Sequence, residues 1–235
     1  MTIFKTVPAT MARTLRVLGH LLSYPDAELR AHLPEMRAAL RDERALTSGR
    51  LIEIDALIGR LRGPRPLEVE AAYVELFDRG RGTALHLFEH VHGDSRDRGP
   101  AMVDLVRTYE QSGLLLAPGE LPDYLPVVLE FASTQPPQQA SEFLREIAHI
   151  LQSLFGALIE RESAYASIPA ALLDLAGQRA QAVKLPAEPA IDESWEEPMA
   201  FGGCSTEGQA RPGQPQPVRI VKQPPVGPAP HGART

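Results

Sequence analysis

The chain has 235 residues, of which 43% are hydrophobic and 23% are charged, and its formal net charge is −6. This length suits one sizeable core with or without a tail, and the acidic balance excludes the basic footprint of a nucleic-acid-binding protein. The single cysteine, Cys204, excludes an internal disulfide and a metal site built on several cysteines, and it favours a reducing, cytoplasmic compartment.

The N-terminal region does not have the pattern of a signal peptide. Arg13, Arg16 and His20 interrupt its apolar residues, so that no continuous hydrophobic stretch forms. No run in the chain approaches the roughly 18 apolar residues that a membrane-spanning helix needs. We therefore expect any contact with a membrane to be made through a partner.

The composition and the spacing of the apolar residues predict an all-α protein. Leu, Ala, Glu and Arg are abundant and runs of β-branched residues are almost absent, which favours helix over strand. Apolar residues recur at intervals of three and four, the period of one helix face. These intervals predict about nine helices, at 11–22, 29–40, 51–61, 67–78, 83–92, 98–112, 121–133, 141–166 and 169–184.

Local signals predict several helix ends and buried faces. Asp26 is expected to cap the second helix, and Asp97 the helix that carries Pro100 in its first turn. The faces predicted to be buried are Ala71, Val74 and Phe77 in the helix at 67–78, and Met102, Leu105, Val106 and Tyr109 in the helix at 98–112.

The composition changes near residue 186. Pro and Gly become frequent there, and the helical spacing of apolar residues disappears. A segment of this kind cannot bury enough apolar surface to order itself. We predict a single-domain helical bundle at 1–185, followed by a flexible, disordered Pro/Gly-rich tail at 186–235.

The stretch HLFEHVHG, residues 86–93, contains the pattern H-x-x-E-H. On a helix, His86, Glu89 and His90 would share one face, where they could hold zinc and a general base for a zinc-dependent hydrolase. Glu160 or Glu162 could supply a third ligand. The competing interpretation is stronger, because five common residues match such a pattern by chance and Gly93 would end the helix beside the site. We expect ordinary or partner-binding histidines and no metal.

Four arginines lie in two glycine-containing connectors that precede helices. Arg79 and Arg81 belong to the first connector, and Arg96 and Arg98 to the second. If the two connectors converged, they could bind a phosphate, a nucleotide or an acidic peptide. Acidic residues alternate with them, so ion pairs between helices are the simpler expectation. No phosphate-binding glycine motif is present.

The segment ELPDYLP, residues 120–126, places two polar or aromatic residues between prolines. The prolines stiffen Asp123 and Tyr124, and stiffened side chains beside a loop suit recognition of a partner. A capped helix with a buried tyrosine is an equally good interpretation of the same residues.

The central block of the chain resembles the NarJ family, the dedicated assembly chaperones of respiratory nitrate reductase and relatives of the TorD/DmsD chaperones. The resemblance runs in register from Tyr73 to Phe131 and rests on FDRGR, LFEHVHG, SRDRG and ELPD as a set. LLSYPDAEL near the N-terminus and WEEPMAF at 195–201 are similar to the family as well. The family's pattern begins at LFEH, which leaves His86 outside it, and usually has His where this chain has Tyr124.

The resemblance implies an all-helical chaperone without enzymatic activity and without a cofactor of its own. Such proteins bind the N-terminal segment of the nitrate reductase catalytic subunit in the cytoplasm and hold the apoenzyme while the molybdenum cofactor is inserted. They delay attachment to the membrane until insertion is complete. The implied partners are therefore this catalytic subunit and proteins that deliver the cofactor, with no nucleic acid and only indirect contact with a membrane.

A groove between helices could take the apolar face of an amphipathic client peptide. The expected walls include Leu76 and Val91, and acidic side chains would orient basic residues of the peptide. The full set of candidate client-binding residues is Tyr73, Phe77, Asp78, Arg79, Phe88, Glu89, His90, His92, Arg96, Asp97, Arg98, Asp123, Tyr124 and Leu125.

Overall fold

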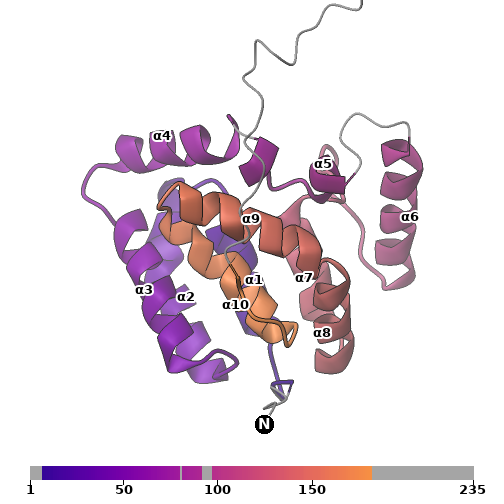
Figure 1. Ribbon diagram of the computed structural model, residues 1–235. Coiled ribbons are helices and arrows are strands. Elements are labelled where there is room, and N and C mark those ends of the chain that lie inside the picture. Colours follow the sequence, from indigo (N-terminus) through magenta and orange to yellow (C-terminus); the bar gives the residue numbers. More distant parts are fainter. Residues whose placement is uncertain (1–6, 80, 92–96, 182–235) are drawn as a thin grey trace, which may run out of the picture. The chain divides into compact units, whose positions relative to one another are not determined.

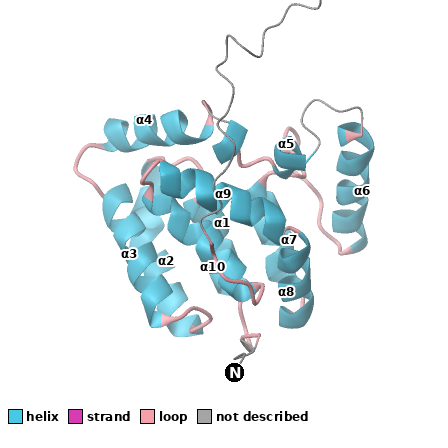
Figure 2. Cartoon of the chain, viewed as in Figure 1, coloured by secondary structure: helices cyan, strands magenta, loops and turns pink. Residues whose placement is uncertain are grey.

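The computed structural model describes residues 7–79, 81–91 and 97–181. Within these ranges every regular secondary-structure element is a helix, as predicted. Figure 2 shows the helices joined by short loops, with no strand in the described part. The helices are α1 (Ala12–Leu21), α2 (Ala27–Glu43), α3 (Ser48–Leu61), α4 (Pro66–Phe77), η1 (Arg81–Thr83), α5 (Leu87–Val91), α6 (Arg98–Gln111), α7 (Leu125–Thr134), α8 (Pro137–Glu146), α9 (Ala148–Glu160), η2 (Ala164–Ala166) and α10 (Ser167–Leu175).

Several predicted features lie outside the described residues. They are His92, Arg96, Cys204 and the tail at 186–235. Among the helices that are described, none is both long enough and apolar enough to cross a membrane.

The first two helices form where their sequence patterns predict. Leu15, Leu18 and Leu22 recur at helical spacing and are fully buried. The Asp26 side chain accepts a hydrogen bond from the Leu29 N–H at 2.8 Å, which confirms the predicted cap at the start of α2. Apolar spacing and a local cap therefore place both helices.

The core is organised around α1. This helix packs against α7 and α2, and α10 packs against α9 and α3, so that segments distant in sequence lie side by side (Figure 1). Gly19 allows the close approach of α1 to α7, because a β-carbon at this position would lie 3.3 Å from the Pro126 carbonyl oxygen and 3.4 Å from the Leu129 β-carbon. The contact between these two helices positions the start of α7 and the segment before it.

α4 buries a different face from the predicted one. Phe77 is buried as expected, but Ala71 and Val74 are exposed and Tyr73 is buried instead. The tyrosine hydroxyl donates to the Leu22 carbonyl at 2.7 Å, and its ring packs 4.8 Å from that of Phe77. A hydrogen bond to the end of α1 therefore sets which face of α4 is buried. The spacing of apolar residues within α4 contains no information about this bond.

α6 is also less buried than predicted. Only Tyr109 is buried, and Met102, Leu105 and Val106 are half-buried. Figure 1 shows the helix at the edge of the domain, beyond α7. Its Asp97 N-cap makes no side-chain capping bond, which corrects the predicted cap.

Two further helix boundaries correct the sequence prediction. The helix expected at 141–166 is interrupted at Ile147, where α8 ends and α9 begins. The last helix ends at Leu175 rather than near 184, and Gly177 adopts a left-handed φ of 73° just after it. The largest correction, at 83–92, belongs to the candidate site.

Candidate functional site

A short antiparallel pairing joins two segments that lie far apart in the sequence. The Leu87 N–H donates to the Asp123 carbonyl at 3.0 Å, and the Leu125 N–H donates to the Leu85 carbonyl at 2.8 Å. His86 and Tyr124 therefore face each other as an isolated β-bridge. This pairing brings HLFEHVHG and ELPDYLP together, which neither motif could show alone.

The helix predicted at 83–92 is wrong in extent. In the described part of this range, up to Val91, the helical residues are the end of η1 and the five residues of α5, and His86 lies in the extended segment between them. The Asp123 carboxylate accepts the Phe88 N–H at 3.2 Å. Because Phe88 is the second residue of α5, this carboxylate satisfies one of the free N–H groups at the helix start from a distant segment.

Asp123 is fully buried, and its carboxylate is held by three groups. Besides the Phe88 N–H, His86 Nδ1 lies 3.5 Å from Oδ1 and Arg98 Nη2 lies 3.9 Å from Oδ2. Burial alone would raise the pKa of this carboxyl. The imidazole, the N–H and the guanidinium outweigh burial and lower the pKa, so that the group remains ionised.

His86 is the candidate residue that sequence reasoning missed. The neighbouring Asp123 raises the pKa of its imidazole, with help from Glu89 and against the effects of burial and of Arg98. Its ring also packs 5.2 Å from the ring of Tyr124, at 33°. No local signal marks this position, because its partners lie more than 30 residues away in the sequence.

The zinc-site geometry proposed from the sequence is not formed. His86 precedes α5, so it does not share a helix face with Glu89 and His90. The His90 Nε2 atom is hydrogen-bonded to the Ala84 carbonyl oxygen at 2.8 Å. Among the residues at 7–79, 81–91 and 97–181, no group of three or more His, Cys, Asp and Glu side chains is arranged to hold a metal ion.

Of the four connector arginines, Arg79 and Arg98 have side chains that the structure describes, and each has a carboxylate partner. Arg79 is exposed and pairs with Glu75 at 2.8 Å, one turn earlier in the chain. Arg98 lies 3.8 Å from Glu89 and also reaches Asp123. The Arg98–Glu89 pair joins α6 to α5, as expected of ion pairs between helices, whereas Arg79 and Glu75 pair within one stretch of chain.

Other candidate residues divide into buried and accessible groups. Tyr73, Phe77 and Leu125 are buried with Asp123, so these side chains support the site from within. Phe88, Glu89, His90, Arg98 and Tyr124 are half-buried, whereas Asp78, Arg79 and Asp97 are exposed. Tyr124 is tied to the core as well, because its hydroxyl hydrogen-bonds to that of Tyr73.

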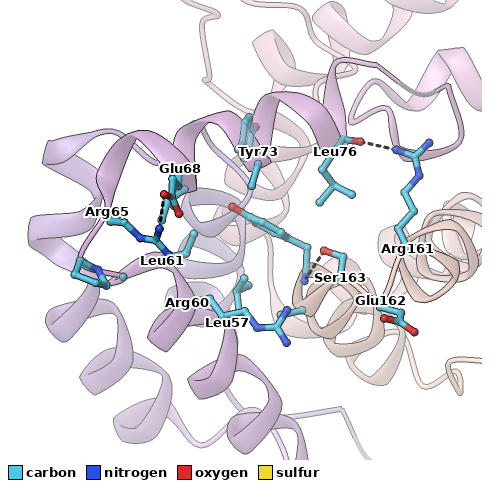
Figure 3. Close-up of a pocket in the computed structure, with 16 residues that line it drawn as sticks. Leu57, Arg60, Leu61, Arg65, Glu68, Tyr73, Leu76, Arg161, Glu162 and Ser163 are labelled. Carbon is cyan, nitrogen blue, oxygen red and sulfur yellow. Dashed lines mark hydrogen bonds and ion pairs between the residues drawn. The ribbon is translucent and has the colours of Figure 1, made fainter.

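The proposed groove walls belong to two different hollows. Tyr73 and Leu76 line a hollow of about 490 Å³ between α3, α4 and the segment 161–165. Figure 3 shows Arg161 reaching across its edge to the Leu76 carbonyl oxygen, which it contacts at 3.3 Å. Tyr124 instead lines a hollow of about 520 Å³ between α1, α7 and the loop at 114–116.

The second hollow continues along α1. A neighbouring hollow of about 410 Å³, lined by the start of α2, shares His20 and Ser23 with it. We call the two together the α1 groove. Helices around one core, with apolar hollows open at the surface, define the class of an all-helical binding domain.

Comparison with known proteins places the chain within this class. Residues 23–167 match the family model described as nitrate reductase delta subunit, and the chain belongs to this family. It is 43% identical over 198 residues to the nitrate reductase molybdenum cofactor assembly chaperone NarJ of Escherichia coli K12, a match that covers 84% of each chain. This confirms the resemblance found in the sequence.

Two further similarities were found. NarW of Escherichia coli K12, whose name assigns it the same chaperone role provisionally, is 48% identical over 69% of this chain and 68% of its own length. A crystal structure of a candidate redox enzyme maturation protein from Archaeoglobus fulgidus superposes with a TM-score of 0.48 and 20% identity, over 70% of this chain and 92% of that one. Both of these Escherichia coli relatives are named as assembly chaperones, which confirms the prediction of a chaperone.

Proposed function

We propose that this chain is the assembly chaperone of a nitrate reductase. It binds the N-terminal segment of the catalytic subunit in the cytoplasm and holds the apoenzyme for insertion of the molybdenum cofactor before membrane attachment. One observation carries the proposal: 43% identity across 84% of both chains to Escherichia coli NarJ, which is named a nitrate reductase molybdenum cofactor assembly chaperone.

The physical basis is that the apolar face of the client segment leaves water and contacts an apolar surface of the chaperone. A newly made N-terminal segment that later docks elsewhere exposes an amphipathic face, and a helical domain can cover it with a groove. The half-buried Phe88 and Tyr124 offer aromatic surface for this contact. Glu89, Asp78 and Asp97 are accessible carboxylates that could orient basic residues of the client.

The buried residues have a different task within the proposal. Asp123 cannot touch a client in this structure, because none of its surface is exposed. It acts as a positioning residue by starting α5 and by pairing the segments that carry Phe88 and Tyr124. Tyr73, Phe77 and Leu125 hold the same region from the core side.

Calorimetry with the full chain tests the proposal. A synthetic peptide with the N-terminal sequence of the catalytic subunit from the same genome should bind with 1:1 stoichiometry at micromolar or lower concentration. A scrambled peptide of identical composition is the control. The proposal is wrong if the native peptide releases no binding heat and the tagged chain, purified from nitrate-respiring cells, does not bring down the catalytic subunit.

Cofactor delivery requires a second measurement. Nitrate reductase made in cells that lack this chain should contain less molybdenum per catalytic subunit, and restoring the chain should restore the metal content. Proteins that supply the cofactor are expected to co-purify with the chaperone only while the catalytic subunit is present.

A further inference from the structure

The α1 groove runs along one exposed side of α1. Its two hollows share His20 and Ser23, and one of them also reaches Arg16. Seven residues separate Arg16 from Ser23, which corresponds to about 10 Å along a helix axis. Both residues line the same hollow, so this distance is the length of that hollow alone, and the second hollow extends the groove further toward α2.

The groove offers large apolar side chains to solvent. Leu115 is 85% exposed and Tyr24 is 45% exposed, one beside each hollow. Tyr109 and Phe131 are buried and form part of the wall of the hollow that Leu115 lines. Exposed apolar side chains that adjoin a preformed hollow are typical of a surface that binds another chain.

The charge along the groove is strongly negative. Five carboxylates line it, against one arginine and two histidines: Asp26, Glu28, Glu35, Glu120 and Glu130 against Arg16, His20 and His32. Arg16 is occupied by Glu130 at 3.3 Å, and His32 by Glu35 at 2.8 Å. The negative charge that remains favours a cationic ligand.

The hollow between α3 and α4 has the opposite balance. Three arginines line it against two glutamates: Arg60, Arg65 and Arg161 against Glu68 and Glu162 (Figure 3). A cationic segment would be repelled there and attracted to the α1 groove. The difference in charge, more than any difference in volume, distinguishes the hollow between α3 and α4 from the α1 groove.

We propose that the α1 groove is the docking site for a cationic amphipathic helix, with apolar residues of this helix in the hollows and Lys or Arg residues against the carboxylates. That this helix is the client's N-terminal segment rests on the proposed function. The inference adds the charge of the segment and the site, which shares Tyr124 with the surface described above but includes none of Phe88, Glu89, Asp78 and Asp97.

Charge reversal at two accessible carboxylates tests the site. Glu28→Lys with Glu120→Lys should weaken binding of the client's N-terminal peptide at least tenfold, or about 1.4 kcal/mol, and should reduce its salt dependence. The matched control is Glu142→Lys with Glu146→Lys, which makes the same change in net charge on exposed positions of α8. Equal circular dichroism spectra and melting temperatures establish that both variants fold.

A milder pair keeps the test decisive if charge reversal disturbs α2. Glu28→Gln with Glu120→Gln should weaken binding about threefold, and Leu115→Ser should weaken it without changing the salt dependence. Equal affinity of the groove and control variants for the native peptide would overturn the site while leaving the chaperone function intact.

A designed peptide tests the α1 groove separately from the proposed chaperone function. A cationic amphipathic helix with Leu residues along its apolar face, unrelated to any client, should bind the wild-type chain and lose affinity in the groove variant. If the native peptide fails to bind and this peptide succeeds, the proposed function fails and the groove stands. If this peptide binds all variants equally, or none, the proposed groove is wrong.

Discussion

Asp123 and His86 form an ion pair, 3.5 Å between Oδ1 and Nδ1, that joins two segments of irregular backbone beneath the surface. The carboxylate is fully buried and the imidazole side chain is 31% exposed. Each shifts the pKa of the other toward the charged form. The pair thus stabilises the region on which Phe88 and Tyr124 are displayed.

Replacing the buried carboxylate should destabilise the fold. Asp123→Asn removes the charge opposite His86 and Arg98 and places an amide where a carboxylate accepted the Phe88 N–H. Breaking a buried pair from one side typically costs about 3–5 kcal/mol, and partial exposure of His86 places the expected loss at the lower end. Urea unfolding at neutral pH measures it.

Asp104→Asn is the matched control for that measurement. Asp104 lies on α6 with 76% of its side chain exposed, 3.6 Å from Arg107. Its substitution should change stability by less than about 0.5 kcal/mol. If the two variants unfold at the same urea concentration, the Asp123 cluster is not a source of stability.

The His86 pair should also make stability depend on pH. Because the pKa of His86 is raised on folding, its contribution is complete below about 6.5, the unfolded value, and declines as pH rises through the higher folded pKa. Asp123 has a lowered pKa, so its contribution is complete above about 3.9 and declines as pH falls through the folded value.

The stability difference between the wild-type chain and His86→Gln reports the histidine part. This difference should be largest near pH 6 and should shrink as pH rises above the folded pKa. Titration of the imidazole by NMR supplies that pKa directly. A difference that grows with pH, or a His86 pKa below that of a model peptide, contradicts the assignment.

Tyr73 should contribute more through its hydroxyl than an ordinary surface tyrosine. Tyr73→Phe leaves the Leu22 carbonyl and the Tyr124 hydroxyl without their buried partner. A loss of about 1–3 kcal/mol is expected for such groups. Tyr24→Phe is the control, since Tyr24 is 45% exposed and bonds Glu70 at 3.1 Å in contact with solvent. Thermal unfolding of both variants should show a clear decrease only for Tyr73→Phe.

The same contacts show why some helices were predictable from sequence and others were not. α1 and the start of α2 follow from apolar spacing and from Asp26, whose side chain accepts the N–H of Leu29, only three residues away. α5 depends on Asp123, 35 residues further along the chain, for its first N–H partner. A sequence window around residues 86–93 contains no information about that carboxylate.

The candidate site was predictable to a similar degree. Its two motifs were found by residue type, because histidines mark HLFEHVHG and prolines mark ELPDYLP. Their pairing was not, since it rests on backbone bonds of Leu87 and Leu125. His86 was discounted because it lies outside the family pattern, and only its distance to Asp123 brings it into the site.

The contact between α1 and α7 provides a prediction with an internal control. Gly19→Ala would place a methyl group 3.3 Å from the Pro126 carbonyl oxygen, so the two helices must separate slightly, at a cost of about 1–3 kcal/mol. Gly59→Ala on α3 has no heavy atom within 4 Å and should stabilise the chain by about 0.5–1 kcal/mol, because alanine favours the helix. Unfolding free energies should therefore move in opposite directions. Because Pro126 and Gly19 also line the α1 groove, the same Gly19→Ala variant should weaken peptide binding, whereas Gly59→Ala should leave it unchanged.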